Sequence, residues 1–115
     1  MPPDPYQPGR PNPLDLEMPE WAHDDPDLAD LFRSFVTQLP ERADVMEGLL
    51  ERRDLEALQV EAHQLRGTAG AYGFPYISEA AAALESTVKA QLALDTVRTH
   101  VREVASLCRR AGRRE

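Results

Sequence analysis

The sequence predicts an all-α fold, an antiparallel up-down four-helix bundle with an additional N-terminal helix. Three observations predict this class. Apolar residues recur at steps of three and four, capping residues and prolines divide that pattern into short segments, and no stretch alternates as a β-strand would. Because the connections between the segments are short, consecutive helices should run antiparallel.

The first two predicted helices meet at Pro40. Asp25 is a suitable N-cap because Pro26 follows it at the first helical position. The apolar stripe that follows comprises Leu28, Leu31, Phe32, Phe35 and Leu39. Proline is unfavourable inside a helix, so we expect this helix to stop at Pro40 and a second to run from there to about Arg53. The apolar positions of the second are Ala43, Met46, Leu49 and Leu50.

Three further helices complete the predicted bundle. Asp54 is expected to cap the third, which Gly73 ends; its seam consists of Leu55, Leu58, Ala62, Leu65, Ala69 and Tyr72. Pro75 is expected to open the fourth, which continues to about Leu92. Asp95 is expected to cap the fifth, with Val97, Val101, Val104 and Leu107 or Cys108 facing inward.

Charge and proline are concentrated near the N-terminus. Eight of the ten prolines lie in residues 1–26, and the first 30 residues contain eight acids and one base, whereas residues 31–115 are neutral overall. We therefore expect a disordered, Pro-rich acidic leader over residues 1–24 and one helical domain over residues 25–115.

The net charge of −7 disfavours a nucleic-acid partner, and the longest apolar run, Ala80–Leu84, is too short for a membrane span. A signal pattern is missing, so we expect a cytoplasmic protein. We also expect it to be a monomer.

The outward face of the third predicted helix contains the candidate functional residues. On a helical wheel His63 points away from the apolar seam, with Arg66, Gly67 and Gly70 on the same side. Two glycines that do not face the core each cost about 1 kcal/mol relative to alanine, so we interpret them as room for a partner to approach the imidazole. An exposed imidazole next to a cation suits a transiently phosphorylated histidine, although a surface histidine beside two accidental glycines is the alternative.

The stretch AHQLRGTAGAYGF, Ala62 to Phe74, closely resembles the signature of histidine-containing phosphotransfer (HPt) domains, and the downstream AAALE fits the next helix of that family. The glycine-rich run looks most like the phosphotransfer domains of chemotaxis-type kinases. The resemblance implies that His63 is the phosphoacceptor and that Arg66, where the family usually has lysine, helps to hold the phosphoryl group. It also implies that Gly67 makes room for the partner.

Further candidates surround this motif. The resemblance to chemotaxis-type domains implies that Glu85 is bonded to the other imidazole nitrogen; a plain helix-surface pair with Lys89 is the alternative. Gln59 and Gln64 are expected to border the partner contact, Gly70 to lie within it, and Phe74 to belong to an apolar docking patch. We expect no metal site and no nucleotide site in this chain, since nucleotide-binding motifs are missing.

The resemblance therefore implies a phosphorelay intermediate and not a complete enzyme. The expected partners are response-regulator receiver domains and a histidine kinase or hybrid kinase, with Mg²⁺ on the receiver only. Two alternatives remain open. His63 could be the substrate of a chemotaxis-like kinase acting in trans, or the bundle could bind receivers as an adaptor without transfer.

Overall fold

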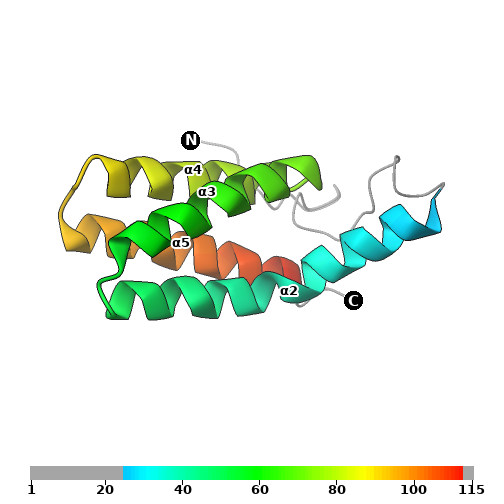
Figure 1. Cartoon of the computed structure of the whole chain (residues 1–115), viewed down its shortest axis with the longest axis horizontal. Helices are drawn as coiled ribbons and strands as arrows, with labels where there is room; N and C mark the ends of the chain where they lie inside the picture. The colour runs from blue at the N-terminus through cyan, green and yellow to red at the C-terminus, as the bar shows by residue number, and fades with distance from the viewer. Residues whose placement is uncertain (1–24, 113–115) are drawn as a thin grey trace, which may run out of the picture.

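A computed structural model describes residues 25–112, and these residues form four helices and no strand. The helices are α2 (Pro26–Glu51), α3 (Leu55–Ala71), α4 (Pro75–Lys89) and α5 (Leu94–Gly112). Consecutive helices run antiparallel and lie side by side as a bundle (Figure 1). The all-α class is confirmed. The predicted leader, residues 1–24, lies outside the described residues.

The prediction of a separate helix ending at Pro40 was wrong, because α2 continues through this residue. Proline has no N–H, so the carbonyl of Val36 loses its usual helical donor, and α2 bends where it passes the end of α5 (Figure 1). Gly112 lies against this bend; a Cβ there would overlap the Pro40 ring. The buried positions keep one helical phase across the proline, since Leu39 and Ala43 are both fully buried, and this shared face favours a continuous helix.

The predicted caps at the first and third helix starts are confirmed. The carboxylate of Asp25 accepts a hydrogen bond from the Asp27 amide at 2.9 Å, and that of Asp54 accepts one from the Ala57 amide at 3.2 Å. The fifth helix differs, because α5 begins at Leu94 and Asp95 therefore lies within its first turn. A negative charge is favourable there as well, since the helix dipole is positive at its N-terminus.

Three helices end on the same backbone motif, in which one residue adopts a left-handed conformation. Gly73 has φ 88° and ends α3 as predicted; the Phe74 amide donates to the Ala69 carbonyl at 2.8 Å. Arg53 (φ 58°) and Gln91 (φ 56°) occupy the equivalent positions after α2 and α4. The fourth helix consequently stops at Lys89, earlier than predicted.

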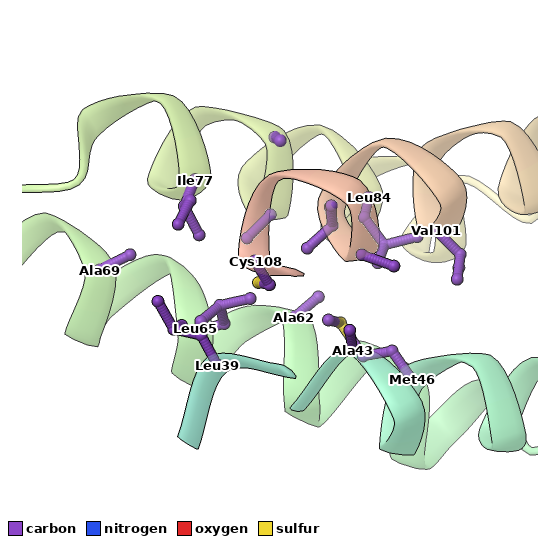
Figure 2. Close-up of a cluster of buried hydrophobic side chains, with 14 of the residues drawn as sticks. Leu39, Ala43, Met46, Ala62, Leu65, Ala69, Ile77, Leu84, Val101 and Cys108 are labelled. Carbon is purple, nitrogen blue, oxygen red and sulfur yellow. The ribbon is translucent and has the colours of Figure 1, made fainter. Parts of the chain in front are cut away.

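The core is formed by inward-facing residues of all four helices. Figure 2 shows side chains from each helix pointing into one interior, among them Leu39, Met46, Ala62, Leu65, Ile77, Leu84, Val101 and Cys108. Cys108 is fully buried, in agreement with its predicted inward position, and its thiol is free; burial raises the pKa of this thiol to about 12. This packing fixes the outward faces of α3 and α4, on which the candidate site lies.

An aromatic cluster joins the N-terminal part of α2 to the α3–α4 turn. The rings of Phe35 and Tyr72 stack with centroids 4.8 Å apart, and those of Phe32 and Phe74 stack at 5.8 Å. Phe74 is only 2% exposed. The prediction that it belongs to an exposed docking patch was therefore wrong; its ring stabilises the fold.

Candidate functional site

His63 projects from the middle of α3 into solvent. Its neighbours in the seam, Ala62 and Leu65, are buried, whereas the His63 side chain is 59% exposed. The outward direction predicted from the helical wheel is confirmed. An imidazole placed in this way is accessible to another macromolecule while its backbone is held rigidly by the core.

Glu85 reaches the same imidazole from α4. Its side chain is only 4% exposed, and its Oε2 lies 2.9 Å from His63 Nδ1. The pKa of this carboxyl is lowered, and an ionised carboxylate can only accept hydrogen bonds, so Nδ1 must carry the proton. The lone pair of the neutral ring then resides on Nε2. The contact between Glu85 and His63 that the resemblance implied is therefore present.

Two cations surround the Glu85 carboxylate. Lys89 Nζ lies 3.3 Å from Oε2, one helical turn further along α4, and Arg66 Nη1 lies 3.2 Å from Oε1. Burial by itself would raise the pKa of Glu85, but the hydrogen bonds from His63 and Lys89 and the positive charge of Arg66 outweigh it. Both contacts considered for Glu85 thus occur together, because His63 and Lys89 approach the same carboxylate oxygen, Oε2.

The two carboxylate oxygens of Glu85 are held differently. Oε2 contacts both His63 and Lys89. Oε1 is buried and makes no hydrogen bond, so its contact with Arg66 is an ion pair without hydrogen-bond alignment. A second guanidinium nitrogen of Arg66, Nη2, lies 3.4 Å from His63 Nδ1. Since Nδ1 already donates to Glu85, this approach adds positive charge beside the ring without adding a hydrogen bond to it.

The two glycines of this face have different surroundings. A Cβ built on Gly67 would meet nothing within 4 Å, so the fold does not require glycine there. A Cβ on Gly70 would lie 3.3 Å from the Ser78 hydroxyl oxygen of α4. Gly70 is itself exposed, so its expected place within the partner contact stays a prediction, but its Cβ direction is bordered by the neighbouring helix.

The remaining predicted contact residues lie on either side of His63. Gln59 is half-buried and lines a surface recess together with Leu55, Val88 and Leu92. Gln64 is exposed, next to His63 in the chain. Neither side chain forms a hydrogen bond with the imidazole, so both belong to the border of the site and not to its centre.

Val60 and Ser78 were missed by the sequence reasoning. Val60 is 51% exposed and precedes His63 by three residues, so it lies on the same outward surface. The wheel that placed His63 outward would also have placed Val60 there. Ser78 donates to the backbone carbonyl of Arg66 at 2.8 Å, and nothing in the sequence pattern signals a contact between two helices at that position.

Residues 25–112 contain no group of three or more His, Cys, Asp or Glu side chains arranged to hold a metal ion. None of the helices described here has the length and apolar character needed to cross a membrane.

In a comparison with protein families, a family model described as Hpt domain matches residues 30–113. That span contains His63, Glu85 and all of α3, α4 and the shared core. Searches of curated proteins and of solved structures gave no match.

Proposed function

Because this chain belongs to the Hpt domain family, whose members transfer phosphoryl groups in phosphorelays, we propose that His63 is its phosphoacceptor. The phosphoryl group arrives from the aspartate of a receiver domain, or from a kinase, and leaves to another receiver. The observation that carries this proposal is the hydrogen bond from His63 Nδ1 to buried Glu85, which leaves Nε2 unprotonated on an exposed ring.

Transfer onto the histidine needs no separate base. The Nε2 lone pair of His63 attacks phosphorus in line with the scissile bond, an N–P bond forms, and the P–O bond to the receiver aspartate breaks with its electrons on the leaving carboxylate. The ring becomes cationic while Nδ1–H continues to donate to Glu85. The reverse sequence returns the group to a second aspartate, and we assign any Mg²⁺ to the receiver.

Arg66 is the residue proposed to hold the phosphoryl oxygens. Its guanidinium is close to the ring, with Nη2 3.4 Å from Nδ1, and its side chain is 45% exposed. Arginine binds phosphate oxygens through several N–H groups in one plane, whereas the lysine usual in the family offers a compact charge. A planar guanidinium next to the ring is therefore suited to an anionic substituent on it.

The proposed contact surface for the receiver consists of Val60, Gly67 and the exposed edge of His63. Val60 offers apolar area, and the open space above Gly67 lets a partner backbone come close. Gln59 and Gln64 border this surface. No further chemistry is required of these residues, since the proposal assigns the phosphoaspartate and its activation to the partner.

The direct test is incubation with a phosphorylated receiver. The expected product carries an acid-labile, alkali-stable label, which is lost in His63→Gln. His100→Gln is the matched control, because His100 is a half-buried histidine of α5 away from the α3–α4 face. Retention of the label in His63→Gln would refute the proposal, and receiver binding without any label would favour the adaptor function.

The bond between His63 and Glu85 also favours one second candidate, in which His63 is the substrate of a chemotaxis-like kinase acting in trans. Glu85→Ala distinguishes the two. A large loss of labelling by a kinase with intact receiver exchange would favour the kinase substrate, whereas equal losses would favour the relay intermediate.

A further inference from the structure

Ser78 connects α4 to the backbone of α3 beneath the site. Its hydroxyl donates to the carbonyl oxygen of Arg66 at 2.8 Å, across twelve residues of chain. Two other hydroxyls of these helices bond within their own helix. Thr68 donates to the Gln64 carbonyl on α3, and Thr87 donates to the Ala83 carbonyl on α4. Ser78 therefore differs from these residues in spanning two helices.

Gly70 provides the space for this contact. In a regular helix the carbonyl of residue 66 also accepts the amide of residue 70, so the Ser78 hydroxyl approaches the same turn of α3. A Cβ on Gly70 would lie 3.3 Å from the Ser78 oxygen, closer than an ordinary van der Waals contact. The absence of that carbon lets the hydroxyl approach the Arg66 carbonyl directly.

The same two helices meet again at the proposed catalytic pair. On α3, Arg66 follows His63 by three residues, and on α4, Glu85 follows Ser78 by seven, which is two turns along one face. Three polar side-chain contacts thus tie α3 to α4: from Ser78 to the Arg66 carbonyl, from His63 to Glu85 and from Arg66 to Glu85. Because each residue adds about 1.5 Å along the helix axis, a slide of one residue would lengthen and misalign these hydrogen bonds.

We propose that Ser78, accommodated by Gly70, is a positioning residue that sets the axial register of α3 and α4 and so keeps Glu85 on His63 Nδ1. The relevance of this register to phosphoryl transfer rests on the function proposed above. Without the Ser78 bond, the hydrogen bond between Glu85 and His63 Nδ1 is formed in a smaller fraction of molecules. The ring proton then shifts toward Nε2, the nitrogen that usually carries it in a free neutral histidine side chain. The population of rings with a nucleophilic Nε2 then falls.

Nitrogen NMR of the His63 side chain tests this inference without any partner. At a pH where the ring is neutral, the wild-type protein should show predominantly the Nδ1–H form, and Ser78→Ala should show a measurable gain of the Nε2–H form. The rate of phosphoryl transfer should fall roughly 2- to 10-fold, the range expected for one neutral hydrogen bond. Ser78→Thr, which keeps a hydroxyl, should restore both readouts.

Two further variants separate positioning from general stability. Thr87→Val removes a buried hydroxyl from the same helix that bonds only within α4, so it should leave the His63 tautomer unchanged. Gly70→Ala pushes on Ser78 from the other side and should shift the tautomer in the same direction as Ser78→Ala. Circular dichroism and thermal unfolding confirm that each variant is folded when the spectra are recorded.

A wild-type tautomer population in folded Ser78→Ala would overturn the inference, as would an equal shift in Thr87→Val. The outcome is separate from that of the proposed function. If the tautomer shifts as expected but no receiver labels the wild-type protein, Ser78 still positions the ring and the proposed function fails.

Discussion

Substitution of Gly67 should make the protein more stable and less active. In the middle of α3 the backbone of glycine loses more freedom on folding than alanine does, and a Cβ at this position would meet nothing within 4 Å. Gly67→Ala should therefore raise the free energy of unfolding by about 0.8–1 kcal/mol. For a domain of this size that gain corresponds to a rise in Tm of about 4–8 °C.

Gly70→Ala supplies the matched comparison. The gain in helix propensity is the same, but the new methyl would lie 3.3 Å from the Ser78 oxygen, so Ser78 must move by a few tenths of an ångström. The increase in stability should consequently be smaller than for Gly67→Ala, and it can change sign. Urea denaturation of the two variants side by side measures the difference.

A larger side chain at position 67 tests the proposed contact surface. Gly67→Leu should remain folded, because leucine is a strong helix former and the space is open. In the complex, however, its side chain would hold the receiver away from His63. A displacement of 1 Å can reduce a rate on the order of 100-fold, so transfer from a phosphorylated receiver should fall by that factor while Tm stays at or above that of wild type. Wild-type transfer rates in Gly67→Leu would refute the argument that this glycine serves close approach, and a lower Tm in Gly67→Ala would refute the argument from open space.

Three further predictions concern the fold and the buried carboxylate. Phe74→Ala should lower the free energy of unfolding by about 3–5 kcal/mol in urea denaturation, since the ring is buried among aromatic neighbours; a change below about 0.5 kcal/mol would show a surface residue instead. Gln91→Gly should raise stability by roughly 1 kcal/mol, because φ 56° suits glycine at a helix end, and an unchanged or lowered Tm would contradict this account. The pKa of Glu85 lies below its ordinary value of 4.5, so its ionised form stabilises the folded state above that pH and this contribution is lost as the pH falls through the lower folded-state pKa. Denaturation from about pH 7 to about pH 3 should accordingly show a shallower loss of stability in Glu85→Gln than in wild type, and parallel curves would contradict the lowered pKa.

Patterns within single helices predicted the features that depend on one helix. The caps at Asp25 and Asp54, the stop at Gly73 and the outward direction of His63 each follow from local backbone chemistry or helical phase. The continuity of α2 was also accessible, because the apolar positions keep their phase across Pro40. The rule that proline interrupts a helix predicted a break at Pro40, but tertiary packing outweighed it.

Features that depend on two helices could not be predicted in the same way. Helical phase fixes the direction of Glu85 around α4 but not its height relative to His63, so the bond between them and the pair with Lys89 remained alternatives. The same limit applies to Gly70, because its proximity to Ser78 depends on the position of the next helix and cannot be predicted from α3 alone. Phe74 was misplaced for a related reason, since its partner rings lie about forty residues earlier in the chain.

The buried position of Glu85 has a consequence for the direction of phosphoryl flow. Its carboxylate contacts Nδ1 and is surrounded by cations before any phosphoryl group arrives, so little of this network needs to rearrange when the ring gains or loses charge. In the function proposed above, the same atoms of this chain serve acceptance and donation of the phosphoryl group, so the His63 site itself favours neither direction. A site of this kind does not impose a direction on phosphoryl transfer. The relative free energies of the partner aspartyl phosphates decide which way the group travels.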